Sequence, residues 1–558
     1  MNWLAIKIIL AMFVVGVTLS CGGGGAATQP PPPPAGSYYI DCSASTNGNG
    51  TLASPWNTLA NANALTLSPG NELLFQRGTT CQGTLNPLGS GSSAAPIIVD
   101  AYGTGAQPVI NGGANNVGGT NNNATVLLTD QQYWEIRNLE IAGGTLYGIH
   151  VTGNTSNSSL NHFHFINLNV HVALGSNSVW NTGQIFIEPA GIHQVVNDVL
   201  IDGVIAYGGQ IGNGIWIEAG GDWNTAVTAC QQQQPPPTQD LGSNITIQNT
   251  LTHDIYGNGV VVFVASNVLM QNNVIYNTGI CPPSLCGSDS TPGGLWESCC
   301  ISCTVQNNES YANRTFGQYD GADFGSGDHD LDNISQYNYG HDSDGYCWTT
   351  GSGSLPADTN DIFRYNICSN DNRNGTIQPQ GEILIDAYVI GSQVYNNTLY
   401  WNPDPAVSSA AALYNYAYAS TNLGFFENNI IYGAGPGMIQ SVSGYTLNNN
   451  IYWTTSTSPP TWQWQWQGTT YTDFSAYQAA SGQDANSLYA DPLLNDPTYH
   501  AAGKSTTAFT LQTGSPAIGT GTNVCSGISG CNMGTQDFFG NPLPNGSGYD
   551  IGANQAPQ

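Results

Sequence analysis

The densest group of residues able to do chemistry lies between positions 320 and 344. It consists of Asp320, Asp323, Asp328, Asp330 and Asp332, followed by His341, Asp342 and Asp344. Crowded carboxylates raise one another's pKa, so one can stay protonated as a general acid while another acts as a base or nucleophile. Glycosidases use such a pair, about 5 Å apart for retention and about 6.5–9.5 Å apart for inversion. We therefore expect catalytic residues among Asp320, Asp323, Asp344 and His341.

The same acidic run allows two other interpretations. The segment DHDLDN resembles half of a calcium loop with Asp328, Asp330 and Asp332 as ligands, although it lacks Gly at the sixth place and Glu at the twelfth. Asp also forms turns through hydrogen bonds to its own backbone. Catalysis, a Ca²⁺ site and local turns all stay open. No cofactor is expected to be required, with Ca²⁺ as the one candidate.

Short segments that begin with Gly or follow one supply a second set of candidates. They are GIHV (148–151), QIFIE (184–188), GIWIE (214–218), GVVVF (259–263), GADF (321–324), GYCW (345–348) and GEILID (381–386). Side chains alternate across a strand, so apolar positions such as Ile215 and Ile217 are expected inside and the residues between them outside. The predicted outward strip contains His150, Phe186, Glu188, Trp216, Glu218, Phe263, Asp323, Glu382 and Asp386.

This strip predicts a carbohydrate cleft, because aromatic faces stack on sugar rings and carboxylates bind hydroxyl groups. The residues expected to bind substrate are His150, Trp216, Phe263, Asp386 and Arg373. Asp323 belongs to both the strip and the acidic group, which makes it the first catalytic candidate. Glu218 and Glu382, each two Gly-segments away, and Asp344 between them are its candidate partners. The alternative is a polar outer face with carboxylates placed there by chance.

A polysaccharide lyase would need a base, often Lys or Arg, and a cation to neutralise the uronate carboxylate. Between Arg137 and Lys504 the Lys and Arg residues are only Arg314, Arg364 and Arg373. His253 or His341 could serve as the base with bound Ca²⁺. The shortage of cations disfavours an acidic polymer, so we expect a hydrolase ahead of a lyase. A non-catalytic glycan-binding or adhesive protein with the same groove is the alternative from another class.

A repeated Asn-centred phrase indicates the elements that must position these residues. Its copies are centred on Asn249, Asn273, Asn308, Asn338, Asn366, Asn397, Asn429 and Asn450, at steps of 21 to 35 residues. Steps of this size are typical of one structural unit per copy. Each copy reads as strand, Asn, strand. Asn tolerates the left-handed conformation of a sharp turn, and its amide can bond the equivalent Asn one coil away. The phrase therefore predicts a parallel β-helix.

Composition agrees with an all-β solenoid, since Gly accounts for 69 of 558 residues and charged residues for 8%. Helical periodicity is nearly absent after residue 20. We expect a signal peptide at 1–20, a Gly/Pro-rich tether at 21–36 and an N-terminal cap with the first strands at 37–110. The coils are expected at 111–455 and an irregular closing segment at 456–558.

The entry segment, with YYIDCSAS and NELLFQRG, and the ending, with FTLQTGSPAIGTG and GYDIGANQ, carry a resemblance to a known group. Together with phrases such as ISQYNYGHDSDG, they resemble the right-handed parallel β-helix proteins of bacteria. This pectate-lyase-like superfamily contains polysaccharide lyases, glycoside hydrolases and epimerases. The resemblance covers nearly the whole chain after residue 37. It implies a right-handed solenoid and a carbohydrate-active function, but it is weakly specific for chemistry.

The N-terminus predicts export. Residues 1–20 have one Lys and an apolar run that ends in small residues, which is typical of a secretory signal. Signal, Cys21 and a Gly-rich tract together resemble a bacterial lipoprotein, in which Cys21 would be acylated, although Thr18 stands where an aliphatic residue is usual. The alternative is ordinary cleavage with release. We expect a protein that is lipid-anchored to the cell envelope or secreted.

The cysteines support an oxidising compartment, since 13 Cys leave an even number once Cys21 is set aside. We expect Cys42 to pair with Cys81 and Cys525 with Cys531. The expected stapled loop contains Cys281, Cys286, Cys299, Cys300 and Cys303, joined by Cys230, Cys347 or Cys368. Zinc binding by the CCxxC motif is the alternative, but no His lies at ligand spacing.

The charge balance limits the partners, because seven Lys and Arg stand against 36 Asp and Glu, a net charge of −29. Nucleic acid and anionic membrane surfaces are therefore excluded, since phosphate binding needs basic side chains. We expect a polysaccharide partner, membrane contact only through the lipid anchor, and a monomer. Trp462, Trp464 and Trp466 lie on one face of a predicted strand, either as a hydrophobic lid over the last coils or as a platform for sugars.

Overall fold

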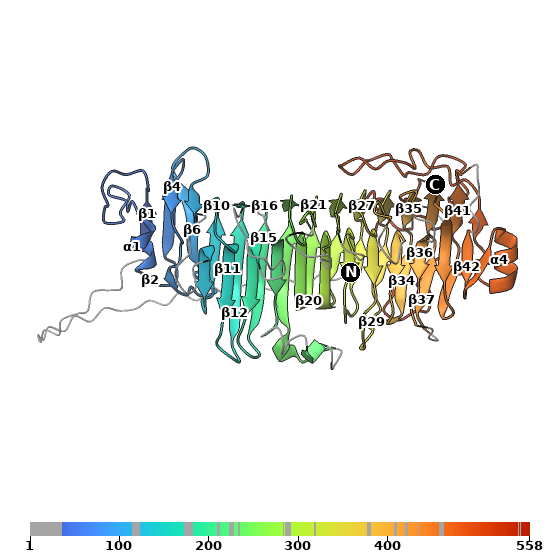
Figure 1. The fold of residues 1–558 in the computed structure, drawn as a ribbon, viewed down its shortest axis with the longest axis horizontal. Coiled ribbons are helices and arrows are strands. Elements are labelled where there is room, and N and C mark those ends of the chain that lie inside the picture. Colours follow the sequence, from blue (N-terminus) through green and yellow to red (C-terminus); the bar gives the residue numbers. More distant parts are fainter. Residues whose placement is uncertain are drawn as a thin grey trace, which may run out of the picture.

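The computed structural model is a right-handed parallel β-helix, which confirms the fold class expected from the sequence (Figure 1). Successive coils stack along one long axis from the N-terminal to the C-terminal end. The structure describes residues 36–113, 123–171, 182–208, 212–221, 228–230, 232, 235–282, 284, 292–316, 320–375, 381–406, 410–418, 422–433, 435–456, 463–544, 546 and 548–557.

Each coil contributes strands to three faces, and the first of these faces carries the segments with leading Gly. Its strands are β8 (Ala124–Thr129), β11 (Tyr147–Gly153), β14 (Gly183–Pro189), β17 (Asn213–Glu218), β20 (Val260–Gln271), β22 (Leu295–Ile301), β25 (Phe324–Ser326), β28 (Trp348–Thr350), β32 (Ile383–Ile385), β36 (Ala411–Asn415), β39 (Gly437–Ser441) and β42 (Trp464–Trp466). Strand β20 turns the corner between the first and second faces at Val264, with φ 52°.

The second face continues the same sheet on the other side of that corner. Its strands are β1 (Ser37–Ile40), β3 (Glu72–Gln76), β6 (Ile97–Tyr102), β9 (Trp134–Arg137), β12 (Ser159–Ile166), β15 (Val195–Asp202), β18 (Gly242–Gln248), the second half of β20, β23 (Thr304–Gln306), β26 (Ile334–Gln336), β30 (Ile362–Arg364), β34 (Ser392–Tyr395), β37 (Gly424–Glu427) and β40 (Tyr445–Asn448).

The third face is a separate parallel sheet made of short strands. They are β4 (Thr80–Gln82), β7 (Val109–Asn111), β10 (Glu140–Ala142), β13 (Asn169–His171), β16 (Ile205–Tyr207), β19 (Leu251–His253), β21 (Val274–Tyr276), β24 (Glu309–Tyr311), β27 (Tyr339–His341), β31 (Ile367–Ser369), β35 (Thr398–Trp401), β38 (Ile430–Gly433), β41 (Ile451–Thr454) and β44 (Leu488–Tyr489). Small pairs outside the three faces are β2 (Thr66–Leu67) with β5 (Leu88–Gly89) and β29 (Asp358–Thr359) with β33 (Val389–Ile390); η1 (Thr238–Asp240) is a short 3₁₀ helix.

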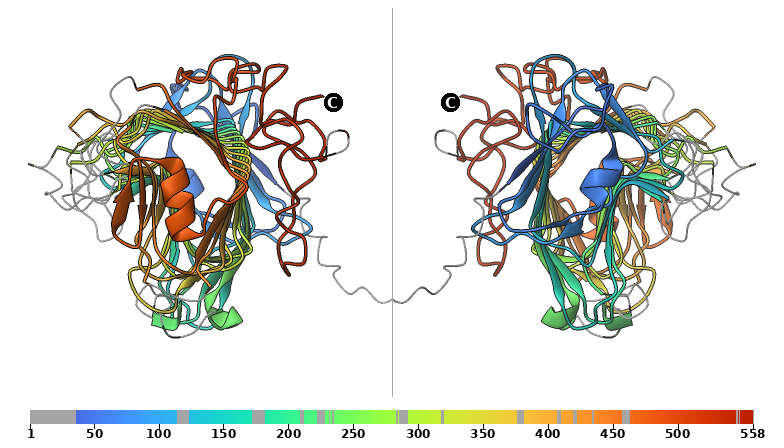
Figure 2. Two further views of the ribbon diagram at one scale, coloured as in Figure 1. Left: turned by 90° about the vertical axis from the view of Figure 1, so that its right-hand side faces the viewer. Right: turned by 90° about the vertical axis from the view of Figure 1, so that its left-hand side faces the viewer.

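A helix covers each end of the coil stack (Figure 2). At the N-terminal end, α1 (Leu59–Asn63) starts where the Thr58 side chain accepts a hydrogen bond from the Ala60 N–H. At the other end, β43 (Thr469–Tyr471) folds antiparallel onto β42, and α4 (Phe474–Ser481) packs beside Trp464, which is 1% exposed. Trp464 is therefore part of a lid; Trp462 lies outside the described residues. Within the described part of the chain, no helix is long and apolar enough to cross a membrane.

Two adjacent residues form the corner between the second and third faces in each coil. The first, such as Asn272 with φ 56°, takes the left-handed conformation. The second, such as Asn273, is buried, and its Oδ1 accepts from the Thr250 N–H at 3.0 Å in the preceding coil. Its Nδ2 donates to Asn308 Oδ1 at 3.0 Å and to the Ile247 carbonyl at 2.9 Å. The sequence prediction gave both roles to one Asn, and the structure divides them between neighbours.

The buried member of each pair forms a ladder along the corner. From Asn273 the ladder continues through Asn308, Asn338, Asn366, Asn397, Asn429 and Asn450. The side-chain oxygen of each of these accepts a hydrogen bond from the backbone N–H of the preceding Asn in the ladder. The repeated Asn are therefore in register, as the sequence predicted. In the coil of Asn249, Thr250 occupies the ladder position and Asn249 itself is the left-handed residue.

Disulfides are present as expected in a protein of an oxidising compartment. Cys42–Cys81 and Cys525–Cys531 confirm the two predicted pairs. In the crowded set, the bonds are Cys230–Cys299, Cys300–Cys303 and Cys347–Cys368. Cys281 is also disulfide-bonded, and Cys286 and Cys21 lie outside the described residues. Because the CCxxC cysteines are consumed in disulfides, the alternative of a zinc site there is wrong.

The chain after β44 does not simply close the end of the helix but returns along its side (Figure 1). Ser369 Oγ donates to the Tyr499 carbonyl at 2.7 Å, and the Gly503 N–H donates to Glu309 at 2.6 Å. Further on, Asn396 Nδ2 donates to the Asp550 carbonyl at 2.9 Å. We call residues 490–557 the C-terminal strap.

We predict that Asn273→Ala lowers the free energy of unfolding by at least about 2 kcal/mol, because it leaves the Thr250 N–H and the Ile247 carbonyl buried without partners. Chemical denaturation would measure the change. The matched control is Asn272→Gly, since Gly adopts the left-handed conformation freely and should change stability by less than about 0.5 kcal/mol. Equal effects of the two substitutions would contradict the ladder as a stabilising element.

Candidate active site

A cleft of about 310 Å³ opens on the outer side of the first face, over strands β22, β25, β28 and β32. Its lining includes the carboxylates Asp320, Asp328 and Asp386 and four aromatic residues, Phe263, Trp296, Phe324 and Tyr346. Mixed polar and aromatic lining of this kind is typical of sites that bind small polar ligands. The lining residues that the structure describes include no Lys, Arg or His.

The hollow exists because Gly residues occupy outward positions of the middle coils. Gly325 in β25 occupies the outward position that Trp296 occupies in β22, and Gly327 occupies the next outward position along the same coil. In the next coil Gly351 has φ 119°, and a Cβ there would lie 2.8 Å from the Cβ of Asp386. A side chain at Gly351 would therefore push Asp386 out of place. The three Gly leave space between Trp296 on one side and Asp386 on the other.

Asp386 follows β32 and is a half-buried carboxylate of the cleft. Burial raises its pKa above the usual range, and the charge of Asp328 adds to the rise. Hydrogen bonds from the Tyr416 hydroxyl and the Ala387 N–H oppose these effects in part. The net result is a carboxyl group that keeps its proton to a higher pH than an ordinary Asp.

Asp328 and Asp320 are more open to solvent. Asp328 is exposed; its Oδ1 accepts from the Gly353 N–H at 2.8 Å, and its carbonyl accepts from Ser298 Oγ at 3.0 Å. The half-buried Asp320 lies 3.3 Å from the Tyr346 hydroxyl, which can donate to its carboxylate. An exposed carboxyl group beside an enclosed one with a raised pKa is an arrangement that acid–base catalysis can use.

The upstream part of the predicted strip points outward but is covered. Phe186, Trp216, Phe263 and Trp296 follow one another along the face, with ring centroids 4.9–5.9 Å apart. Cys230, which is joined to Cys299, and Leu241 pack in one buried cluster with these rings, and Phe186 is 0% and Trp216 2% exposed. The prediction that Trp216 is open to substrate is therefore wrong, whereas Phe263 also lines the cleft.

The polar residues of this upstream part are engaged with their neighbours. His150 Nε2 lies 2.8 Å from Glu188 Oε1, and the His150 ring stacks on Tyr147. Trp216 Nε1 donates to Glu218 at 3.0 Å, and Glu218 is buried. None of His150, Glu188 and Glu218 lines the cleft.

Asp323 and Glu382 lie inside the coils, which corrects the expectation that they point outward. Both are 0% exposed, and Asp323 Oδ1 accepts from Asn313 Nδ2 at 2.8 Å and from Ser343 Oγ at 2.6 Å. The reason is that β25 begins at Phe324 and β32 at Ile383, so the preceding residue belongs to the corner. There the chain turns and two consecutive side chains point inward. A residue enclosed in this way cannot contact a polysaccharide.

The expected number of coils between Glu218 and Asp323 also needs correction. The segment GGLWESCC was expected in a stapled loop, but Leu295–Ile301 forms strand β22 and adds a coil. Glu218 is therefore three coils before Asp323, and five before Asp386, by the register of β17, β20, β22, β25, β28 and β32. At about 4.8 Å per coil, Glu218 is about 24 Å from Asp386. The same omission hid Trp296, whose outward place follows from strand alternation once β22 is recognised.

The three Asp expected to share one Ca²⁺ are directed to different places. Asp328 lies in the cleft and Asp330 inside the coils at 0% exposure. Asp332 has φ 58° at the corner between the first and second faces, where it accepts from Asn360 Nδ2 at 3.0 Å. Their alternation rules out a calcium loop made of these three residues. Asp332 instead forms a turn, which was one of the interpretations of the acidic run.

Asp344, Arg373 and His341 lie away from the cleft lining. Arg314 Nη1 pairs with Asp344 at 3.0 Å, and the Thr315 N–H donates to Asp344 at 3.1 Å. Arg373 donates to the Asn402 carbonyl and to Asn370. The structure therefore gives these charged side chains local partners and leaves the cleft to Asp320, Asp328 and Asp386.

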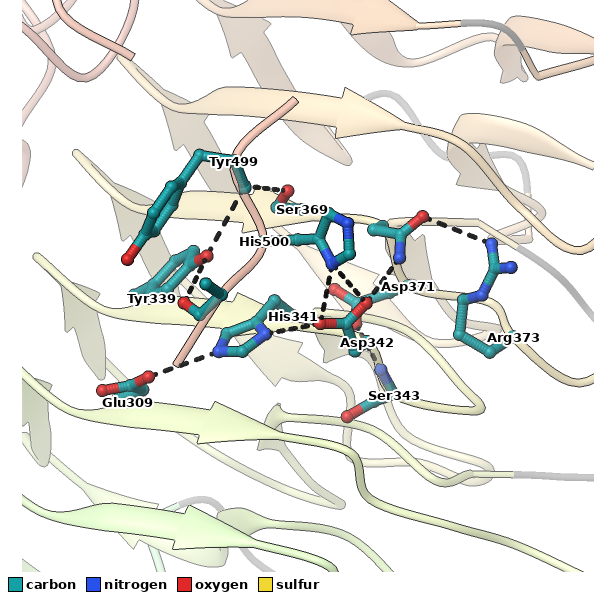
Figure 3. A network of polar contacts seen from close by, with 12 residues as sticks. Glu309, Tyr339, His341, Asp342, Ser343, Ser369, Asp371, Arg373, Tyr499 and His500 are labelled. Atoms are coloured by element: carbon teal, nitrogen blue, oxygen red, sulfur yellow. Dashed lines mark hydrogen bonds and ion pairs between the residues drawn. The ribbon is translucent and has the colours of Figure 1, made fainter. Parts of the chain in front are cut away.

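His341 lies on the third face beneath the C-terminal strap (Figure 3). Its Nδ1 is 2.8 Å from Asp342 and its Nε2 3.3 Å from Glu309. Burial disfavours the imidazolium ion, but the hydrogen bonds with Asp342 and Glu309 outweigh burial and raise the pKa of His341. His500 of the strap reaches the same Asp342 at 3.0 Å. This network fastens the strap, so His341 is placed to stabilise the fold.

Two groups of carboxylates are enclosed within the coils. One group is Asp323, Asp371 and Glu382, and the other is Glu297, Asp330, Asp358 and Asp361. Burial raises the pKa of every one of them, to about 7 for Asp361 and Asp371. Asp361 Oδ1 accepts from the Asn333 N–H at 3.2 Å, in the same coil-to-coil pattern as the Asn ladder. A protonated carboxyl offers one donor and one acceptor, so it can replace a ladder amide.

Comparison with known proteins supports the fold. No protein-family model and no curated protein matches the chain. A crystal structure of a GH136 lacto-N-biosidase from Eubacterium ramulus is similar, with 19% identity, 68% of each chain covered and a TM-score of 0.52. Pectate lyase Pel9A is also similar, with 16% identity over 93% of this chain and 96% of that chain and a TM-score of 0.39. At 19% identity the likeness to the lacto-N-biosidase structure shows the fold alone.

The buried carboxyl groups predict that the protein loses stability as the pH rises. Their folded-state pKa values are raised, so their contribution is complete below the ordinary value of 3.8 and is lost as the pH increases toward about 7. In that window each group lowers the free energy of unfolding by roughly 1 kcal/mol for each unit that the pH rises. We expect the Tm, measured by differential scanning fluorimetry, to fall between about pH 4 and about pH 7.

The matched variant is Asp361→Asn, because Asn keeps the acceptor for the Asn333 N–H and can donate to Thr350 Oγ1. It should have a smaller decrease of Tm over the same pH range and a higher Tm than the native protein near neutral pH. An Asp361→Asn variant with the native slope would show that Asp361 does not titrate in this window.

Proposed function

We propose that the protein is an exported enzyme that hydrolyses glycosidic bonds of a polysaccharide or oligosaccharide in the cleft of the first face. The observation that carries the proposal is the pair of Asp386 and Asp328. One carboxyl is enclosed with a raised pKa, and the other is exposed and held by a backbone N–H at 2.8 Å. This asymmetry supplies an acid and a base or nucleophile.

In this proposal Asp386 donates a proton to the glycosidic oxygen, and Asp328 acts at the anomeric carbon, directly or through a water molecule. Asp320, near Tyr346, binds hydroxyl groups of the sugar. Trp296 and Tyr346 give the cleft its aromatic surfaces. A cleft open to the outer face of a long solenoid suits an extended chain, and the solved structure of similar fold named as a lacto-N-biosidase agrees with glycoside hydrolysis.

A lyase is the second candidate, because three carboxylates converge in one cleft. Asp320, Asp328 and Asp386 offer the oxygen ligands that Ca²⁺ prefers, and Ca²⁺ would neutralise the carboxylate of a uronate substrate. This route needs a base, and the described lining supplies no Lys, Arg or His for it. The hydrolase therefore agrees better with the side chains that are present.

The proposal includes a location outside the cytoplasm. The disulfides of the described residues are typical of an oxidising compartment, and a polysaccharide substrate fits an exported enzyme. Anchoring through acylated Cys21 rests on the sequence pattern of the N-terminus. Mass spectrometry of the exported protein would distinguish a lipid-modified Cys21 from simple cleavage.

We predict that Asp386→Asn and Asp328→Asn each reduce turnover by at least about 10²-fold, because each removes a titrating group while preserving shape. Digestion of a glycan panel would be followed by reducing ends and by the ultraviolet absorbance of unsaturated products. Native activity should decrease as the pH rises through the pKa of Asp386, since the acid must be protonated.

The matched control is Glu218→Gln, a carboxylate of the same face that lies five coils away and outside the cleft. It should retain native turnover. New reducing ends with unsaturated products, and activity lost on chelation of Ca²⁺, would replace the hydrolase by a lyase. Glycan binding without any product would establish the non-catalytic alternative.

A further inference from the structure

A cluster of two His and two carboxylates lies on the second face, near the N-terminal end of the coils. Glu135 is on β9, His162 and His164 are on β12, and Asp198 is on β15. Three successive coils therefore each contribute to it. We call these four residues the His–carboxylate cluster. It is on a different face from the cleft, and the proposed hydrolysis does not use it.

The nitrogen and oxygen atoms of the cluster are close together. His162 Nε2 is 3.1 Å from Glu135 Oε1, and His162 Nδ1 is 2.7 Å from Asp198 Oδ2. His164 Nε2 is 3.2 Å from Asp198 Oδ1, and the two imidazole rings have centroids 3.8 Å apart. Glu135, His162 and His164 can each offer one ligand atom within 4.8 Å of the others.

Three of the four residues, Glu135, His162 and His164, have ligand atoms close enough together to bind one metal ion. Zn²⁺ binds imidazole nitrogen and carboxylate oxygen at about 2.0–2.2 Å in a tetrahedral arrangement, which places ligand atoms about 3.3 Å apart. His162 Nε2 is 3.1 Å from Glu135 Oε1, close to that separation, and His164 offers a third ligand atom within 4.8 Å of both. Asp198 contacts the other ring nitrogen of His162, Nδ1, at 2.7 Å; one imidazole cannot give both nitrogens to the same ion, so Asp198 orients the ring. Imidazole ligands favour a transition metal over Ca²⁺, which takes oxygen ligands.

The network of His341, His500, Glu309 and Asp342 also has two His and two carboxylates, but it fastens the strap, and two other His–carboxylate contacts are simpler. His150 with Glu188 and His171 with Glu140 each join one His to one carboxylate. Of the three groups in the described residues that could hold one ion, this group contains the His residues, and both rings are partly open to solvent. The other two groups are enclosed inside the coils. An ion from solution can therefore reach the His–carboxylate cluster directly.

The backbone also fixes the position of His162. This residue has φ 64° at a corner where the coils on either side have Tyr133 at φ 61° and Asp198 at φ 57°. His, like Asn and Asp, is among the residues found most often in this conformation. Arg137 pairs with Glu135 Oε2 and leaves Oε1 directed toward His162.

We propose that Glu135, His162 and His164 form a binding site for a divalent transition-metal cation, represented by Zn²⁺, with Asp198 of β15 holding the His162 ring in place. The ion would fasten strands β9 and β12 to one another from the outside. Without it, the same four side chains satisfy one another through ion pairs and hydrogen bonds. Binding then stabilises the folded chain by mass action.

The test uses the protein freed of any His-tag and of metal, titrated with ZnCl₂ by calorimetry and by thermal unfolding. We expect saturable binding of one Zn²⁺ per chain and a Tm that rises and levels off with Zn²⁺. His164→Ala and Glu135→Gln should each weaken binding by at least about tenfold. Substitution with Co²⁺ should give the visible absorption of a tetrahedral nitrogen and oxygen site.

The matched control is His171→Ala, which removes a His from a single His–carboxylate pair and should leave the stoichiometry and affinity unchanged. Thermal unfolding in chelator shows whether each variant is folded. A native Tm that does not respond to Zn²⁺ would overturn the proposal. So would Zn²⁺ binding that persists in the double variant His162→Ala/His164→Ala, since the ion would then be bound elsewhere.

Discussion

The register between successive coils is the constraint on which the rest of the structure depends. In a parallel β-helix a shift of one residue exchanges the inner and outer faces of a strand. The buried amides from Asn273 to Asn450 oppose such a shift, because each accepts from a backbone N–H at one axial level and donates at another. Side chains at equivalent positions of successive coils form columns, and the ladder fixes these columns in the coils from Asn273 to Asn450. The cleft and the enclosed carboxyl groups belong to these coils, whereas the His–carboxylate cluster lies in coils that precede the ladder.

The columns explain how one acidic run provides several environments. Asp328, Asp330 and Asp332 are two residues apart, yet one lies in a cleft, one lies inside the coils and one forms a corner. The chemistry of each carboxyl follows from its column rather than from its neighbours in sequence. The protein can therefore have few Lys and Arg residues. Its interior carboxyl groups have raised pKa values, and in their protonated form they need no cationic partner and form hydrogen bonds as amides do.

The fold could be predicted from the sequence because the Asn phrase and the alternating strands are local patterns, and Asp386 and Phe263 followed from alternation. The failures have physical causes. Asp323 and Glu382 precede their strands, at a corner where alternation does not hold. The coil of β22 was missed because its cysteines suggested a loop. The cover over Trp216 depends on a distant segment joined by Cys230–Cys299, and no local pattern reports such a contact.

The C-terminal strap changes how the molecule holds together. In a plain solenoid each repeat contacts only its neighbours, so the ends can fray one coil at a time. Here Gly503 bonds to Glu309 across 194 residues, and Asn396 bonds to Asp550 across 154. Coils from β24 to β35 are thereby tied into one cooperative unit. Loosening one of them exposes part of the strap as well, which gives the C-terminal half a resistance to stepwise unravelling that its repeats alone do not have.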